Sequence, residues 1–250
     1  MSADQKKADE RSPVALVVGA GDALGSAIAK RFAREGFTAC VVRRSEDKLQ
    51  PLVDDIKAAG GKVVAIGADA RKEDQVVELV DRIERDIGPI EVMVFNIGAN
   101  VQFDIVETTA QKYYKVWEMA CFAGFLSGRE TARVMKSRKR GTILFTGATA
   151  AVRGARGFAA FSGAKHGLRA LAQSMARELG PQNIHVAHIV IDGAIDTDFI
   201  RDRFPERYAL KDVDGILNPD HIAETYWFLH TQKRTAWTFE LDVRPYMEPW

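Results

Sequence analysis

Phe161 and Lys165 stand four positions apart in the stretch Phe161-Ser162-Gly163-Ala164-Lys165. On a helix the two side chains share one face, because residues i and i+4 lie one above the other. A phenol at the first position would be a general acid, since the neighbouring ammonium group lowers the pKa of a phenol. Phenylalanine preserves the packing of such a ring but has no proton to donate. Of this pair, only the lysine can carry a charge.

A second group of residues has the spacing of a phosphate-binding loop. Gly19, Gly21 and Gly25 follow an apolar run and precede an amphipathic stretch that contains Ile28 and Phe32. At a strand-to-helix turn, such glycines let the backbone approach a pyrophosphate, and the N–H groups at the start of the helix face the anion. We interpret the segment as a dinucleotide-binding loop, the alternative being a plain tight turn.

Charged residues near this loop bear on which dinucleotide would bind. Arg43 and Arg44 end the second apolar run, where a carboxylate suits the ribose hydroxyls of NAD and arginine suits the 2′-phosphate of NADP. Asp22 in the glycine loop argues for NAD, unless it caps the helix expected to begin at Ala23. We predict NADP(H) as the cofactor, with NAD(H) as the alternative.

Apolar runs alternate with amphipathic stretches along the chain, and most runs are almost continuously apolar, as in parallel strands covered on both faces. The expected strands are Val14–Gly19, Thr38–Val42, Val63–Ile66, Val92–Asn96, Thr142–Thr146, Val186–Ile191 and Trp237–Leu241. The expected helices have apolar stripes at Val76, Leu79, Val80, Ile83 and Ile87, and at Leu168, Leu171, Ala172, Met175 and Leu179. This alternation predicts a doubly wound α/β domain with a parallel sheet.

The expected organisation is a flexible tail over residues 1–12 and one domain over 13–250. A charge-dense segment within 194–216 interrupts the alternation, and we expect a helical excursion there, the alternative being a solvated loop. The net charge of +1 provides no field for nucleic acid or anionic lipid. With neither a signal-peptide pattern nor a run of about 20 apolar residues, a cytoplasmic location is expected. Cys40 and Cys121 are interpreted as buried thiols, not a disulfide or metal site.

These motifs together resemble the short-chain dehydrogenase/reductase family over nearly the whole chain. The glycine loop is similar to the family's Thr-Gly-x-x-x-Gly-x-Gly, Asp69-Ala70 to its adenine motif, 95–98 to its Asn-Asn-Ala-Gly, and 191–197 to its nicotinamide loop, with Asp192 in place of proline. The resemblance implies a Rossmann-like sheet of about seven strands. It also implies cofactor contacts from Gly19, Gly21, Asp22, Leu24, Gly25, Arg43, Arg44, Asp69, Ala70, Asn96, Ile97, Gly98, Lys165, Gly193, Ile195 and Thr197.

The same resemblance places Phe161 at the family's catalytic tyrosine, Ala148 at its serine and Cys121 at its helix asparagine. Only Lys165 remains of that set. Replacement donors could be Thr149, beside the serine position, or Asp192, which is alternatively a turn residue. Tyr113 and Tyr114 are further candidates, although a core or interface role is favoured for both.

Other histidine, arginine and aromatic residues near these motifs have both structural and functional interpretations. His166 is expected on another helix face than Lys165, and His185 and His188 are expected to be satisfied structural histidines in a buried strand. Arg153 and Arg156 would favour an anionic substrate or else be a solvated pair. Phe158, Phe161, Trp117 and Phe199 would line an apolar pocket or form plain core.

We therefore expect an NADP-dependent oxidoreductase with a degenerate Ser-Tyr-Lys set, which reduces a small organic carbonyl, imine or activated alkene. The alternative is a dinucleotide-binding pseudoenzyme or regulatory subunit without redox turnover. By resemblance we expect a homodimer or homotetramer, formed through helices around Tyr113–Lys136 and Phe158–Leu179. The stretch 246–250 could join an interface.

Overall fold

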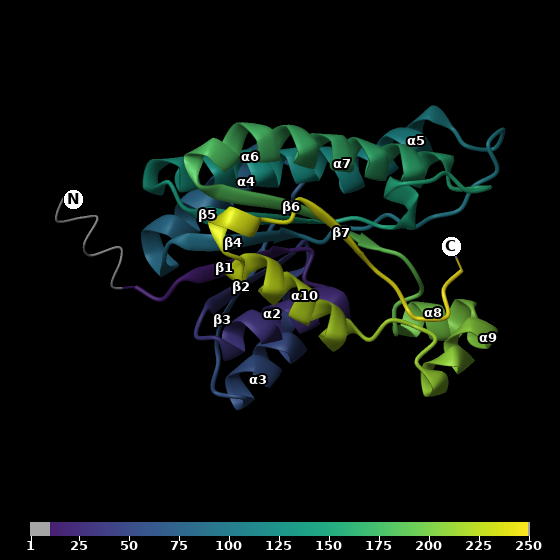
Figure 1. The fold of residues 1–250 in the computed structure, drawn as a ribbon, viewed down its shortest axis with the longest axis horizontal. Helices are drawn as coiled ribbons and strands as arrows, with labels where there is room; N and C mark the ends of the chain where they lie inside the picture. Colours follow the sequence, from purple (N-terminus) through teal and green to yellow (C-terminus); the bar gives the residue numbers. More distant parts are fainter. Residues whose placement is uncertain (1–10, 250) are drawn as a thin grey trace.

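The computed structural model describes residues 11–249 and contains one seven-stranded sheet (Figure 1). All neighbouring strands are parallel, in the order β3-β2-β1-β4-β5-β6-β7. The strands are β1 (Val14–Val18), β2 (Thr38–Arg43), β3 (Lys62–Gly67), β4 (Ile90–Phe95), β5 (Gly141–Thr146), β6 (Ile184–Ile191) and β7 (Glu240–Val243). The predicted doubly wound parallel sheet is confirmed.

Burial on both faces explains why the strand sequences are apolar runs without alternation. All five residues of β1 and all eight of β6 are buried. The strand order changes direction between β1 and β4, because β2 and β3 extend the sheet on one side of this pair and β5, β6 and β7 extend it on the other. The two strands are parallel, so their carboxyl ends lie at the same edge of the sheet. In open α/β sheets a ligand crevice lies at this switch point, outside the carboxyl ends of the strands.

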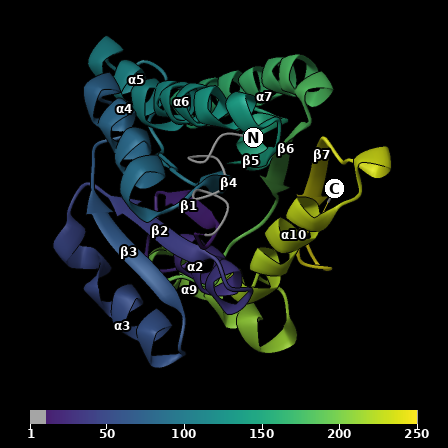
Figure 2. The same ribbon diagram turned by 90° about the vertical axis from the view of Figure 1, so that its left-hand side faces the viewer.

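Helices cover both faces of the sheet, so the domain has three layers (Figure 2). One layer contains α4 (Glu73–Arg82), α5 (Ala110–Trp117), α6 (Ala123–Arg138) and α7 (Ala159–Leu179), with the π-helical turns η2 (Ile83–Ile87) and η3 (Glu118–Phe122). The other contains α2 (Leu24–Arg34), α3 (Gln50–Ala58) and α10 (Pro219–Thr231). Short 3₁₀ turns are η1 (Glu46–Leu49), η4 (Thr149–Ala151), η5 (Gly180–Gln182) and η7 (Arg234–Ala236).

Each helical layer encloses its own apolar core against the sheet. Phe95 and Leu168 lie in the core beneath α4, α6 and α7, whereas Phe32 and Tyr226 lie in the core beneath α2 and α10. α7 ends at Leu179, immediately before Gly180-Pro181, as predicted. Of the expected stripe, Val76, Leu79, Val80 and Ile83 are buried, and Ile87 is half-buried against the same core.

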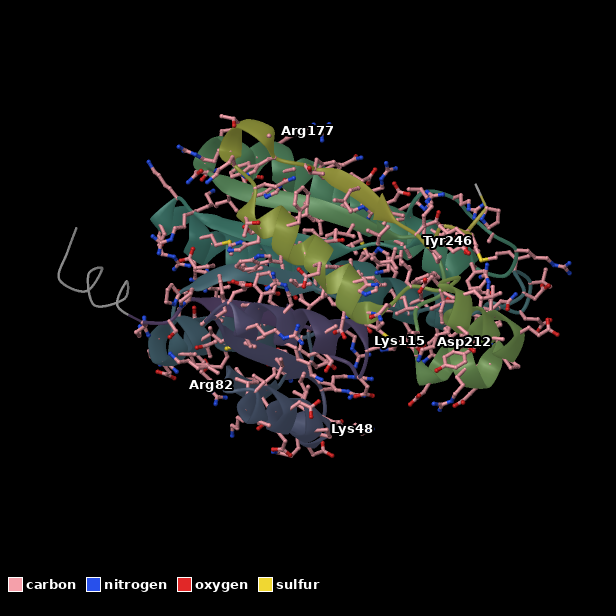
Figure 3. The ribbon with its side chains drawn as sticks, turned by 60° about the horizontal axis from the view of Figure 1, so that its bottom comes forward. Lys48, Arg82, Lys115, Arg177, Asp212 and Tyr246 are labelled. Carbon is pink, nitrogen blue, oxygen red and sulfur yellow. The ribbon has the colours of Figure 1, made fainter. Side chains whose placement is uncertain are left out.

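The segment after β6 leaves the layered body at the carboxyl end of the sheet. It contains α8 (Asp198–Arg203), α9 (Pro205–Tyr208) and the 3₁₀ turn η6 (Ala209–Val213), so a helical excursion is present and a solvated loop is not. Figure 3 shows Asp212 and Tyr246 at this end of the molecule and Arg177 at the opposite end. The excursion therefore stands beside the expected ligand crevice.

The last strand begins later than predicted, at Glu240 instead of Trp237. The polar main-chain groups of Thr238 are bonded elsewhere, because its N–H donates to the Gln232 side chain at 2.8 Å and its carbonyl pairs with His185 Nε2 at 2.8 Å. The Trp237 ring stacks on the His185 ring at 4.8 Å. Apolar character at this point serves side-chain packing and not strand pairing.

Of the predicted tail over 1–12, residues 1–10 lie outside the described residues. Arg11 donates hydrogen bonds to the carbonyls of Glu84 and Arg85, both at 2.9 Å. None of the helices within 11–249 is long and apolar enough to cross a membrane. Trp250, named as a possible interface residue, also lies outside the described residues.

Candidate active site

The glycine loop between β1 and α2 is held by close backbone packing. Gly19 has a φ of +93°, and a Cβ there would lie 2.9 Å from the main chain of Asn96. A Cβ on Gly25 would lie 2.6 Å from the Gly19 carbonyl oxygen. Asn96 Nδ2 also donates to that carbonyl at 3.1 Å. Two glycines are thus required by the protein itself, to bring the start of α2 against the ends of β1 and β4.

Gly21 differs from these two glycines. No protein atom lies within 4 Å of the position that a Cβ would occupy. The residue lines a cavity of about 130 Å³ together with Ser26, Lys30 and Lys48. The first N–H groups of a helix have no acceptors within it and attract anions. The open space in front of Gly21, at the start of α2, therefore fits a bound phosphate group.

A second cavity of about 130 Å³ lies on the other side of the loop, at the carboxyl ends of β1, β2 and β3. Its lining includes Gly19, Arg43, Arg44, Asp69 and Arg71. Arg43 Nη1 lies 3.1 Å from Asp22 Oδ1. Arg44 is exposed and, among residues 11–249, forms no ion pair or side-chain hydrogen bond. One guanidinium group at this cavity is therefore available to an anionic ligand.

The prediction that Asp22 caps the first helix as an alternative to a cofactor role is wrong. α2 begins at Leu24 with Ala23 as its N-cap, and no side chain caps it. The Asp22 carboxylate instead pairs with Arg43, which the strand order brings beside the loop. Because the Asp22 side chain is 86% exposed, this ion pair contributes little to stability.

Asp69, the expected acceptor for an adenine amino group, is already bonded to a residue that the sequence did not single out. Arg71 Nε lies 2.9 Å from Asp69 Oδ1, and Arg71 Nη2 lies 2.6 Å from Oδ2. This bidentate contact lowers the pKa of Asp69 to about 2. Arg71 Nη1 also lies 3.7 Å from Glu118 Oε2. The carboxylate and guanidinium form one fixed unit in the cavity wall.

Lys165 projects from α7 to the ends of β4 and β5. Its Nζ donates to the carbonyl of Thr146 at 2.8 Å and to that of Ile97 at 3.2 Å. The side chain is buried, and this desolvation lowers the pKa of Lys165 to about 8. Its Nζ lies 5.9 Å from the centroid of the Phe161 ring. The predicted shared face of Phe161 and Lys165 is confirmed.

Phe161, Ala148 and Cys121 lie in one apolar cluster beside Lys165. Trp117 and Phe158 pack against this cluster, so three of the four aromatic rings named as pocket lining come together. The fourth, Phe199, is not in this cluster; it is 47% exposed on α8. Burial raises the pKa of the Cys121 thiol. Among the buried residues of this cluster, the Cys121 thiol is the one side chain with a hydrogen-bonding group.

A polar chain lies where β5, β6 and β7 end. Thr149 Oγ1 donates to Asp192 Oδ1 at 2.5 Å, and Arg244 Nη2 lies 3.2 Å from Asp192 Oδ2. Asp192 is 7% exposed, and its N–H bonds to the Val243 carbonyl at 2.9 Å. The structure therefore joins the two predicted candidates Thr149 and Asp192 and adds Arg244, which the sequence reading missed.

The two tyrosines named as possible donors lie elsewhere. A Cβ on Gly163 would be 2.5 Å from the Tyr113 hydroxyl, so this hydroxyl rests on the exposed face of α7. Gly163 and Lys165 are two positions apart and point in nearly opposite directions on a helix. Tyr114 is 52% exposed, and its ring lies 5.9 Å from that of Trp117. The structure does not bring either tyrosine to Lys165.

His166 lies on another helix face than Lys165, as predicted, since it is exposed whereas Lys165 is buried. Its Nδ1 lies 2.9 Å from the Ser162 carbonyl. His185 and His188 are buried in β6 and hydrogen-bonded, as expected of structural histidines, although only one ring nitrogen of His188 has a partner within residues 11–249. His188 Nδ1 bonds Glu240 Oε2 at 2.9 Å, and His185 Nε2 bonds the Thr238 carbonyl at 2.8 Å. Burial lowers the pKa of His188 to about 4.

The segment after β6 holds the other residues expected at the nicotinamide. A Cβ on Gly193 would lie 2.7 Å from Pro245, at a φ of +152°. Ile195 forms a parallel bridge with Leu217. Thr197 Oγ1 accepts the Ile200 N–H at 3.2 Å and so caps α8. These contacts fix the segment above the carboxyl ends of the strands.

Two further observations limit the site. Arg153 and Arg156 are exposed on the loop before α7 and form no ion pair within 11–249. In that part of the chain no cluster of three or more histidine, cysteine, aspartate or glutamate side chains could hold a metal ion.

Known proteins resemble this chain in sequence. A family model described as short chain dehydrogenase matches residues 13–207. A 2-dehydro-3-deoxy-D-gluconate 5-dehydrogenase of Formosa agariphila is 29% identical over 211 residues, which cover 79% of this chain and 80% of the relative. A short-chain dehydrogenase/reductase of Armillaria gallica is 31% identical over 176 residues, 69% of this chain and 67% of the relative.

Solved structures resemble it over almost its whole length. A short-chain dehydrogenase from Rhodopseudomonas palustris is 50% identical, with a TM-score of 0.81, and the match covers 94% of this chain and 100% of the other. A metagenomic short-chain oxidoreductase in complex with NADP is 25% identical, with a TM-score of 0.80 and coverage of 95% and 98%.

Proposed function

Because the chain belongs to the short-chain dehydrogenase/reductase family, we propose that it is an oxidoreductase that uses NADP(H). A bound nicotinamide dinucleotide would supply or accept the hydride. The glycine loop, with Leu24 at the start of α2, would hold the pyrophosphate. Ala70 and Asn96–Gly98 would flank the adenine and the ribose, and Gly193, Ile195 and Thr197 would hold the carboxamide.

The observation that carries the cofactor proposal is Arg44 at the cavity beside the glycine loop. Arg43 and Arg71 already pair with Asp22 and Asp69, whereas Arg44 forms no ion pair within the described chain. A 2′-phosphate would supply the missing anion, since arginine binds phosphate through a planar, bidentate group. The NADP in a structural relative is consistent with this preference.

We further propose that the catalytic set is degenerate. Phe161, Ala148 and Cys121 would stand where relatives carry tyrosine, serine and asparagine, and their shared apolar cluster offers no hydroxyl. Loss of a general acid removes about 10²–10⁴ in rate. Positioning of two reactants alone supplies roughly 7–11 kcal/mol. Hydride transfer to a small carbonyl, imine or activated alkene therefore remains feasible at this site.

The same apolar cluster favours a second candidate, a dinucleotide-binding protein without redox turnover. The two candidates differ in one observable, since both bind NADPH but only the first oxidises it. NADPH oxidation over a panel of ketones, iminium ions and enones distinguishes them.

Binding itself is tested by titrating the protein with NADPH and NADH and following the fluorescence of the reduced nicotinamide. We expect Arg44→Ser to weaken NADPH binding by about 10-fold or more, the loss of one charged hydrogen-bonding pair. NADH binding should change little. Arg177→Ser, an exposed arginine near the end of α7 that lines neither cavity, is the matched control. Equal losses for NADPH and NADH would reject a role of Arg44 at the 2′-phosphate.

A further inference from the structure

The chain Thr149–Asp192–Arg244 fixes the direction of one hydrogen bond at the candidate site. Asp192 is a buried carboxylate that Arg244 pairs with at 3.2 Å, so the carboxylate accepts. The 2.5 Å separation between Thr149 Oγ1 and Asp192 Oδ1 is in the range of hydroxyl-to-carboxylate bonds. The single proton of the Thr149 hydroxyl is therefore directed to Asp192.

A threonine hydroxyl has one proton and two lone pairs. With its proton given to Asp192, Thr149 can only accept a hydrogen bond from anything else that meets it. Thr149 is partly exposed in η4, directly after β5, the strand whose final carbonyl binds Lys165. This acceptor thus lies at the carboxyl end of the sheet, where the proposed hydride transfer would occur.

The neighbouring groups do not replace the missing donor. Phe161 and Ala148 have no polar side-chain atom, and Cys121 is a buried thiol in the same apolar cluster. Two of the three Lys165 protons are bonded to main-chain carbonyls. A ketone or an enone needs a donor for the oxygen on which charge develops, and this arrangement offers it an acceptor instead.

We propose that the site takes a carbon–nitrogen substrate, an iminium ion whose N–H donates to Thr149 Oγ1. This inference rests on the proposed oxidoreductase function and selects one substrate class within it. The rings of Trp117 and Phe158 suit such a ligand, because aromatic faces attract organic cations, whereas the Phe161 ring already faces the Lys165 ammonium group.

The reaction then needs no general acid. A hydride from the reduced nicotinamide dinucleotide forms the new C–H bond, and the π pair of the C=N bond becomes the nitrogen lone pair. The substrate is reduced to an amine, and the dinucleotide is oxidised. The N–H proton stays on nitrogen and remains hydrogen-bonded to Thr149 Oγ1. The absent phenol is not required at any point.

Two compounds with the same framework of two fused six-membered rings test this inference, the dihydroisoquinolinium ion and α-tetralone. We expect kcat/KM with NADPH to be at least about 10²-fold higher for the iminium ion than for the ketone. Thr149→Val should lower kcat/KM for the iminium ion about 10-fold or more, since a charged hydrogen bond is lost. Thr149→Ser keeps the hydroxyl and should retain the wild-type kcat/KM. Thr231→Val removes an exposed threonine hydroxyl on α10 and serves as the control.

Asp192→Asn provides a test of direction. An amide NH₂ can donate to Thr149 Oγ1 and release the hydroxyl proton towards the substrate, so the ketone-to-iminium ratio of kcat/KM should rise about 10-fold. Asp242→Asn removes another carboxylate that pairs with Arg244 and should leave this ratio unchanged. Calorimetry gives a readout apart from turnover, because tetrahydroisoquinolinium should bind the NADP⁺ complex about 10-fold more weakly in Thr149→Val.

Faster turnover of the ketone than of the iminium ion in the wild-type protein would overturn the inference. So would an unchanged amine affinity in Thr149→Val, or silence with both compounds together with no amine binding. Failure of NADPH itself to bind is a separate result, which would instead reject the proposed oxidoreductase function.

Discussion

Phe161 decides what chemistry is open to Lys165. The ring is buried in the apolar cluster and its centroid lies 5.9 Å from Lys165 Nζ, so a hydroxyl added to the ring would lie close to a buried ammonium group. Burial lowers the pKa of Lys165 to about 8, and the lysine is therefore still mainly a cation at neutral pH. A cation at this distance favours the ionised form of a phenol.

We expect Phe161→Tyr to create or raise ketone reduction by about 10²-fold, the lower range of general acid catalysis. The measurement is NADPH oxidation with α-tetralone. Phe158→Tyr adds a phenol to the same cluster without placing it one helical turn from Lys165, and should give no such gain. Equal gains in both variants would show that the position of the phenol relative to Lys165 is unimportant.

Single-residue reasoning from the sequence located Lys165, Thr149 and Asp192, because each follows or faces a strand end. It could not find Arg71 or Arg244. Thr149 and Asp192 are 43 positions apart in the sequence, and the parallel pairing of β5 with β6 brings them together. Nothing in a linear pattern marks which arginine fills the space beside a given carboxylate.

At the scale of elements, the loop between β1 and α2 contains two kinds of glycine. One kind is required by the packing of the protein itself, and the other would be required only by a bound ligand. A Cβ on Gly25 meets the Gly19 carbonyl oxygen, whereas a Cβ on Gly21 meets no protein atom within 4 Å. The glycine pattern alone does not distinguish these cases. The absence of a neighbour at Gly21 is explained by a ligand that must approach the backbone closely.

Gly21→Ala should therefore leave the free energy of unfolding nearly unchanged and weaken NADPH binding at least about 10-fold by steric conflict with the phosphates. Gly25→Ala should reduce both stability and binding. Urea unfolding and fluorescence titration measure the two quantities. Gly154→Ala, also without a protein neighbour within 4 Å, is the control. Undiminished NADPH binding in Gly21→Ala would place the pyrophosphate elsewhere.

The packing of β6 and α10 makes stability sensitive to acid. Burial lowers the pKa of His188 and of His230 to about 4, from ordinary values near 6.5. Between these two pKa values, both histidines are protonated in the unfolded chain and neutral in the folded chain. Stability is fully present above about pH 6.5 and is lost as the pH falls towards 4, by about 1.4 kcal/mol per pH unit for each histidine.

His230→Gln should remove one of these contributions and reduce the slope of the unfolding free energy between about pH 6 and pH 5 by about 1.4 kcal/mol per pH unit. Urea denaturation at several pH values measures the slope. His221→Gln, an exposed histidine on the same helix, should leave the slope unchanged. If the unfolding free energy of His230→Gln and of the wild-type protein changed equally with pH, the lowered pKa of His230 would be contradicted.

At the scale of the whole molecule, the sequence predicted the sheet and its two helical layers, because continuous apolar runs and helical stripes report burial directly. The start of β7 was predicted wrongly because Trp237 is apolar for a different reason, its contact with His185. Apolar runs indicate that a segment is covered, but the covering group must be known before the segment is assigned to a strand.

An aromatic ladder lies on the outer helical layer, with the Arg129 guanidinium group over its last ring, Phe125. The rings of Tyr114, Trp117, Phe122 and Phe125 follow one another at 5.9, 5.5 and 6.1 Å, across α5, the π turn η3 and α6. Tyr114 is 52% and Phe125 37% exposed. Contiguous exposed apolar surface of this kind marks an interaction site.

A second copy of the chain is the expected partner of this ladder, as predicted from the helices around Tyr113–Lys136. Light scattering should give a molar mass that is a multiple of 27.7 kDa for the wild-type protein. Phe125→Glu should shift it towards the monomer, because a carboxylate loses its hydration when it is buried at an interface. Phe204→Glu changes an exposed phenylalanine of the excursion, 48% exposed, and should not. A monomeric wild-type protein would leave the ladder to a different partner.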